Sequence, residues 1–87
     1  MRLPAILDLS AAAPLLAGVT AHRGEAIEID ASGVERIGGV CLQVLLAANA
    51  AWFKDGQDFA IVNPSAGFLS AVRLMGAGEK LGLGEAA

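Results

Sequence analysis

Short apolar runs alternate along this 87-residue chain with longer stretches that have helical periodicity. Ala26–Asp30 alternates apolar and polar positions, a pattern that predicts a half-buried strand. Phe59–Val62 is continuously apolar, as expected for a strand in the middle of a sheet. Leu3–Leu7 is apolar as well, but Pro4 has no N–H to donate to a strand ladder, so we expect an edge strand or the entry to one. The apolar runs therefore predict three strands.

Three other stretches have the spacing of amphipathic helices, and residues that begin or end helices bound them. They run from Ser10 to about His22, from after Gly39 to Phe53, and from Ser65, a potential cap, to Gly76. The expected buried stripes are Leu15, Leu16 and Val19 in the first helix and Phe68, Leu69, Val72 and Met75 in the third. Residues 31–37 are expected to be a connection. The resulting order, β-α-β-α-β-α, predicts an α/β layer with parallel strand pairs and right-handed crossovers.

The central helix has more apolar surface than an ordinary amphipathic stripe requires. Successive helical residues lie about 100° apart, so the face expected to lie against the sheet holds Leu42, Leu45, Leu46, Asn49 and Phe53. The expected wet face holds Gln43, Ala50 and Lys54. A further apolar sector, here called the flanking sector, holds Cys41, Val44, Ala48 and Trp52. Two interpretations stay open: a neighbouring helix covers the flanking sector, or the sector binds a partner protein with Trp52 as an anchor.

The composition favours a small folded domain and argues against several kinds of partner. Hydrophobic residues make up 55% of the chain and charged residues 17%, which is too apolar for a disordered segment. The net charge is −3 and no run of Lys or Arg is present, so we expect neither nucleic-acid binding nor attraction to acidic lipid.

The apolar stretches of the sequence also predict how the domain is organised and where the protein is located. The longest apolar stretch, Val40–Phe53, is too short to span a bilayer, so we expect no direct membrane insertion. No secretory signal is visible, which predicts a cytoplasmic protein. We expect a single domain over residues 1–87, with a frayed tail from about Gly82.

Residue types that carry catalysis or bind metals are scarce. His22 is the only histidine, and no second His or Cys lies at ligand spacing, so no metal site is expected. Cys41 has apolar neighbours and is expected to be a small buried hydrophobe rather than a reactive thiol. The glycines match neither a dinucleotide-binding motif nor a P-loop. We therefore expect no catalytic residues and no cofactor; a small enzyme or ligand carrier would need a deep pocket near Asp30 and Gly38.

The junction between the strand ending at Asp30 and the central helix carries a family resemblance. The segment Asp30–Leu42, DASGVERIGGVCL, resembles the core signature of the STAS domain, the module of sulphate transporters and anti-sigma factor antagonists. Ile61–Gly76 resembles the strand, turn and helix that follow in that family. The resemblance, from Leu7 to about Gly76, implies a STAS-like α/β fold: a small mixed or parallel sheet with helices mainly on one face.

The turn before the central helix departs from the family pattern. Gly38 stands where the family has Asp, and Gly39 stands where it has the phosphorylatable Ser or Thr. Cys41 replaces the usual glycine of the helix opening. The exposed N–H groups of a helix N-terminus attract anions, but no hydroxyl is present from Gly38 to Val40. We therefore expect a docking surface with no phosphorylation at Gly39, the family position; Ser32 and Ser65 are other hydroxyls near strand ends.

The resemblance implies a non-catalytic protein-interaction module of bacterial signalling, similar to anti-sigma factor antagonists. Its partner would be a kinase-type anti-sigma factor, and the alternatives are a chemotaxis component or, for a small cytoplasmic STAS subunit, the ATPase of a lipid-trafficking ABC transporter. A homodimer through the unpaired apolar face is a further possibility. The predicted partner-binding residues are Arg36, Gly38, Gly39, Val40, Cys41, Val44, Ala48 and Trp52.

Overall fold

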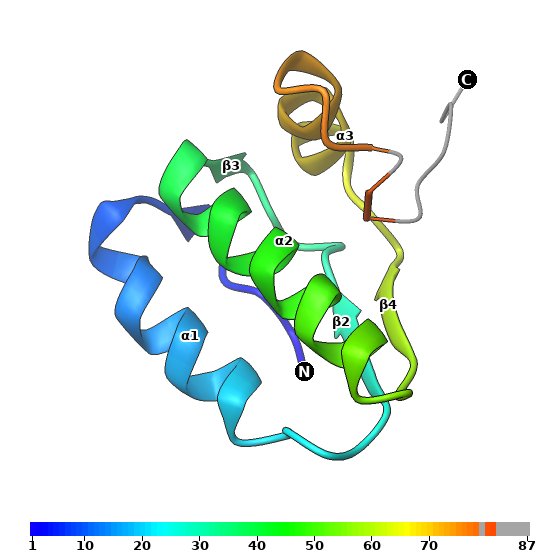
Figure 1. The fold of residues 1–87 in the computed structure, drawn as a ribbon. Helices are drawn as coiled ribbons and strands as arrows, with labels where there is room; N and C mark the ends of the chain where they lie inside the picture. The colour runs from blue at the N-terminus through cyan, green and yellow to red at the C-terminus, as the bar shows by residue number, and fades with distance from the viewer. Residues whose placement is uncertain (79, 82–87) are drawn as a thin grey trace.

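The computed structural model describes residues 1–78 and 80–81, which form strands and helices in the order β-η-α-β-β-α-β-α (Figure 1). The strands are β1 (Ile6–Leu7), β2 (Ile27–Asp30), β3 (Arg36–Ile37) and β4 (Phe59–Val62). The helices are the 3-10 helix η1 (Leu9–Ala11) and the α-helices α1 (Ala12–Thr20), α2 (Gly39–Lys54) and α3 (Ala66–Leu74). This is the expected small α/β fold, with one strand more than the sequence pattern predicts.

Two short parallel strand pairs form the sheet layer. β2 pairs with β4, with Ile27 opposite Phe59, and β1 pairs with β3, with Ile6 opposite Arg36. β3 lies within the segment expected to be a connection. It contains only two residues, one exposed and one buried. A run this short cannot show the alternation of apolar and polar positions that identifies a strand.

The N-terminal segment joins the two pairs and does not form a free edge. The Leu3 N–H donates to the Asp30 carbonyl at 2.9 Å, and two residues further on the Ala5 carbonyl accepts the Glu35 N–H at 2.8 Å. Pro4 therefore lies where the chain changes its partner from β2 to the residues leading into β3. Because the pairing is interrupted there, the missing proline N–H costs no ladder hydrogen bond.

Helix α2 is rotated relative to the sequence-based expectation. Its buried residues are Cys41, Leu42, Leu45, Ala48 and Trp52, whereas Phe53 is 85% exposed. The expectation that Phe53 lies against the sheet is therefore wrong. So is the interpretation of Cys41, Ala48 and Trp52 as an accessible docking face, because α1 lies beside α2 and the flanking sector packs into the core (Figure 1). Val44 is half-buried against the same core.

The other two helices follow the predicted pattern with shifts of register. Ser65 caps α3 as expected, since its Oγ accepts the Phe68 N–H at 3.0 Å. The first helical segment begins with η1 instead of a cap at Ser10. Leu16 and Met75, expected in buried stripes, are exposed. The expected tail from Gly82 lies outside the described residues.

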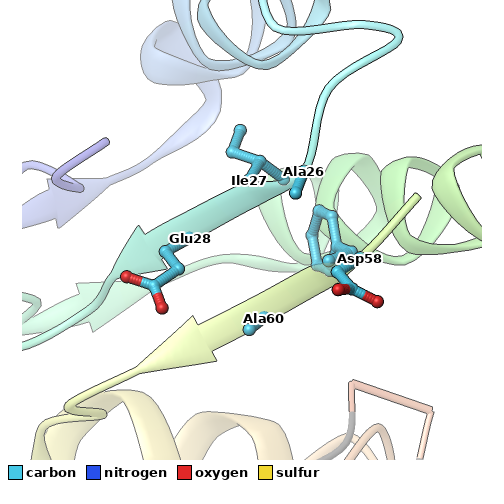
Figure 2. Close-up of a pocket in the computed structure, with 6 residues that line it drawn as sticks. Ala26, Ile27, Glu28, Asp58 and Ala60 are labelled. Atoms are coloured by element: carbon cyan, nitrogen blue, oxygen red, sulfur yellow. The ribbon is translucent and has the colours of Figure 1, made fainter.

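The face of the β2–β4 pair opposite the buried one carries small and charged side chains. Figure 2 shows Glu28 and Ala60, which are partners in the register, on this face. The buried face carries Ile27, Ile29 and Ile61. Within residues 1–78 and 80–81, no helix combines the length and apolar character needed to cross a membrane.

Candidate functional site: the turn between β3 and α2

The parallel pairing of β1 with β3 brings two strand ends together at one edge. Asp8 follows β1 and Gly38 follows β3, and the Gly38 N–H donates to the Leu7 carbonyl at 2.9 Å. Helix α2 begins at the next residue. A shallow groove at this edge is lined by Ile6, Leu7, Asp8, Arg36, Ile37 and Gly38.

The amino end of α2 has no side-chain cap. Gly38, the N-cap residue, has an extended backbone (φ −89°, ψ 171°) and makes no side-chain hydrogen bond to the helix, and the first turn contains no acidic residue. The N–H groups of a first helical turn have no partner inside the helix and carry the positive end of its dipole. The surface at Gly38–Val40 is therefore suited to acceptors such as a carboxylate or a backbone carbonyl of another protein.

Charged side chains of both signs flank this turn. Arg36 is exposed on β3. The Asp8 carboxylate accepts a hydrogen bond from the Ser10 hydroxyl at 2.7 Å, and this bond holds the pKa of Asp8 below its ordinary value. Asp8 is therefore an anion at neutral pH, so the turn presents a cation, an anion and free N–H groups.

The cysteine beside the turn is not positioned as a nucleophile. Cys41 is buried, its Sγ donates to the Asp8 carbonyl at 3.2 Å, and burial is the main cause that raises the pKa of its thiol. A raised pKa leaves the thiol protonated and weakly reactive at neutral pH. The turn is thus arranged for binding, and its nearest thiol belongs to the core.

The two glycines of the turn are not required by the backbone. Neither Gly38 nor Gly39 has a positive φ. A Cβ on Gly39 would meet nothing within 4 Å, and a Cβ on Gly38 would meet only the Leu7 carbonyl oxygen, at 3.7 Å. Both positions therefore accommodate a Cβ without displacement, and the backbone of the turn does not depend on glycine at either one.

The structure brings together only part of the predicted binding set. Arg36, Gly38, Gly39 and Val40 are exposed on one continuous segment, and Val40 is 50% exposed. The remaining four are less accessible: Val44 is half-buried, and Cys41, Ala48 and Trp52 are buried.

Trp52 already contacts residues of this chain and is not available to anchor a partner protein. Its Nε1 donates to the Glu25 carbonyl at 2.6 Å, and its ring meets Phe59 edge-on with centroids 6.0 Å apart. The Arg23 guanidinium carbon lies 5.8 Å from the ring centroid, which adds a cation–π contact. Trp52 therefore holds the turn after α1 against the carboxyl end of α2.

Sequence reasoning did not place Asp8 or Ser10 among the residues of this turn. They are about thirty residues from Gly38 in the chain, and only the β1–β3 pairing makes them adjacent. The available signal was that Asp8 directly follows an apolar run, because the carboxyl ends of parallel strands meet at one edge.

Another depression lies at the start of β2 and β4, and Figure 2 shows the residues that line it. It is bordered by the carboxylates of Glu28 and Asp58 and by small or apolar side chains. Its described lining residues include no Ser, Thr, Cys or His and no cation. Among the residues that the structure describes, no group of three or more His, Cys, Asp or Glu side chains could hold a metal ion.

The fold and the turn define a class: a small α/β domain with α1 and α2 on one side of parallel strand pairs and a bare helix N-terminus at the surface. A family model described as "Mlab, STAS domain" matches residues 1–84, and the chain therefore belongs to the STAS domain family. Members are typically protein-interaction or regulatory modules and are generally non-catalytic. Searches of curated proteins and of solved structures found no match to this chain.

Proposed function

We propose that this protein is a non-catalytic interaction module of bacterial signalling, similar to anti-sigma factor antagonists, that docks a partner protein through the turn between β3 and α2. The docking surface consists of Arg36 to Val40, with Asp8 beside it. The observation that carries the proposal is the uncapped amino end of α2, which is exposed and has room for a partner at Gly39. This role would place the domain in the cytoplasm.

Each part of the docking surface can contact a different kind of group on a partner protein. The first-turn N–H groups of α2 can donate to carboxylates or carbonyls. Arg36 can pair with a carboxylate, and the half-exposed Val40 supplies an apolar contact. Cys41 is buried directly beneath the turn, and Ala48 and Trp52 are buried further along α2, so these three side chains do not touch the partner.

Docking at this turn is proposed to be independent of phosphorylation. Gly39 has no hydroxyl, so no phosphate can be placed at the family position. Stoichiometric phosphate transfer to the wild-type protein by a serine kinase would contradict this part of the proposal.

Two substitutions test the surface without disturbing the core. Val40→Asp places a carboxylate in the first turn of α2, where its negative charge interacts favourably with the positive end of the helix dipole. Arg36→Glu reverses a surface charge. Both are expected to weaken binding of a kinase-type anti-sigma factor by about tenfold or more, measured by calorimetric titration. Unchanged thermal melting by circular dichroism would show that the fold is intact.

Leu16→Asp is the matched control. Leu16 is 55% exposed, close to the exposure of Val40, but it lies on α1. It should bind the partner like the wild type. Wild-type affinity in both Val40→Asp and Arg36→Glu would overturn the proposed docking surface.

A second candidate is a small subunit of a lipid-trafficking ABC transporter, bound to its ATPase. The bare Gly39 favours this role, because a constitutive subunit needs no phosphorylation switch. Stable co-purification with a transporter ATPase, and no binding to an anti-sigma factor or a chemotaxis protein, would favour the second candidate over the first.

A further inference from the structure

A surface groove with apolar walls runs along α2 toward its carboxyl end, and one of its wall residues, Leu46, is half-buried against the core. Its walls include Leu46, Ala47, Ala50, Phe53, Lys54 and Lys80. Phe53 is 85% exposed although its neighbour in the chain, Trp52, is 2% exposed. On the side of the groove opposite α2, Lys80 is held in place because the Asn49 side-chain amide donates to its carbonyl.

The core does not account for this exposed phenylalanine. Helix α2 buries the face that holds Trp52, and Phe53 lies about 100° further around the helix. Leu46 and Ala50 extend the apolar surface from Phe53 toward the middle of α2, so the three side chains form a stripe at helical spacing. A continuous apolar stripe on a helix surface is typical of an interaction site.

The charge around the stripe indicates what kind of partner it fits. The chain has a net charge of −3, yet among the residues that the structure describes, the charged side chains lining this groove are those of Lys54 and Lys80. Asp55, next along the chain, is engaged elsewhere, because its carboxylate pairs with the Arg23 guanidinium at 2.6 Å. The groove is therefore an apolar surface with a basic rim on an acidic protein.

We propose that this groove binds an amphipathic helix of a partner protein, with the helix's apolar stripe over Phe53 and acidic residues beside Lys54 and Lys80. Helix-in-groove recognition requires an apolar groove with anchors at helical spacing, and complementary rim charges select the partner. A second copy of this chain fits less well, because a two-fold axis at the groove would place both lysines of one copy near those of the other.

This inference does not rest on the proposed docking at the turn. Val40 and Phe53 are thirteen positions apart in α2, which corresponds to about 20 Å along the helix axis. One partner could cover both surfaces, but each surface is tested with its own variant. Failure at one surface leaves the other proposal standing.

The test uses two labelled synthetic peptides of about four helical turns. Both carry the same leucine stripe, and the remaining positions are mainly glutamate in one and lysine in the other. By fluorescence anisotropy, the wild-type protein is expected to bind the glutamate peptide about tenfold more tightly than the lysine peptide. Amide shifts in NMR spectra should be largest at Leu46, Ala50 and Phe53.

Three variants sharpen the assignment. Phe53→Asp should lower the affinity for the glutamate peptide about tenfold or more, and Lys54→Glu combined with Lys80→Glu should reverse the preference between the peptides. Leu9→Asp is the matched control, since Leu9 is 74% exposed but lies in η1, near the opposite end of α2. Its affinity should equal that of the wild type.

Several outcomes would overturn the proposal. These are equal affinity for both peptides, no binding to the wild type, or amide shifts confined to other surfaces. Sedimentation that shows a dimer abolished by Phe53→Asp would assign the groove to a second copy. Nuclear Overhauser contacts between the Phe53 ring and residues 82–87 in the free protein would assign it to this chain's own end.

Discussion

Gly67 allows α3 to approach the connection before β3. A Cβ at this position would lie 2.5 Å from the Glu35 carbonyl oxygen and 3.2 Å from that of Val34. Ser65 holds the same contact, because its hydroxyl donates to the Val34 carbonyl at 2.5 Å while it caps α3. One glycine and one serine thus position the start of α3 against the segment that leads to the candidate site.

Gly67→Ala is expected to destabilise the domain even though alanine is the better helix former. Helix propensity favours alanine by about 1 kcal/mol, but the clash with backbone atoms should cost about 2–3 kcal/mol, which leaves a net loss of about 1–2 kcal/mol. Urea unfolding followed by circular dichroism measures the difference. Gly39→Ala is the control, since its Cβ meets nothing within 4 Å, and it should leave the stability unchanged or raise it.

Cys41 provides a chemical test of the core beneath the turn. Its side chain is 1% exposed, and burial raises the pKa of its thiol. We expect a disulfide reagent such as Ellman's to react with Cys41 only when the domain opens, at a rate that rises with urea concentration. Immediate stoichiometric reaction in native buffer at neutral pH would show that the cysteine is accessible.

Helix α2 shows how neighbouring elements select among apolar faces. Its sequence is apolar around most of its circumference, so periodicity alone leaves more than one face that could be buried. The choice is made by α1, which packs beside α2, and by β4 beneath it. The buried face is therefore centred on Leu45 and Trp52, and the face with Phe53 is left for a partner.

The adjacent pair Trp52 and Phe53 tests this orientation directly. Trp52→Ala removes a buried indole with its hydrogen bond to Glu25 and is expected to cost about 3–5 kcal/mol, a large part of the stability of a small domain. Phe53→Ala should change the free energy of unfolding by less than about 0.5 kcal/mol. Urea unfolding of both variants measures the contrast; equal losses would contradict this orientation of α2, and a larger loss for Phe53→Ala would mean that the opposite face is buried.

The ion pair between Arg23 and Asp55 joins two turns that are distant in the chain. It closes the end of the α1–α2 pair, where Arg23 also lies over the Trp52 ring. The side-chain hydrogen bond from Arg23 lowers the pKa of Asp55. Hydrogen bonds likewise lower the pKa values of Asp8, from the Ser10 hydroxyl, and of Asp30, from the Ser32 backbone N–H.

These shifts predict how stability depends on pH. A carboxylate whose pKa is lower in the folded than in the unfolded chain adds stability above its ordinary pKa, 3.8 for aspartate, and loses it as pH falls through the folded value. The domain is therefore expected to keep its stability from neutral pH down to about pH 5 and to lose it below about pH 4. Thermal melting across this range measures the profile.

The variants Asp55→Asn and Arg23→Gln identify the source of the acid sensitivity. Each removes the ion pair, so each should be less stable than the wild type at neutral pH and lose less additional stability on acidification. An unchanged acid limb in both variants would mean that Asp55 does not contribute to it.

Much of the fold follows from local patterns. Alternation at Ala26–Asp30, the continuous apolar run at Phe59–Val62 and the cap at Ser65 each correspond to an element of the structure. These signals are readable because each depends on residues close together in the chain. β3 was not predictable in this way, since two residues carry no period and its partner β1 is distant in sequence.

The candidate site, like the fold, was predictable from the sequence only in part. The sequence by itself determined the family pattern at Asp30–Leu42, the bare glycines at the turn and the absence of a hydroxyl there, because these depend only on residue identity and order. Only the tertiary structure decided that Asp8 lies beside the turn, that Trp52 is buried and that Phe53 is exposed. Those facts depend on which strands pair and which helix covers α2, and long-range packing settles them when several faces of a helix are similarly apolar.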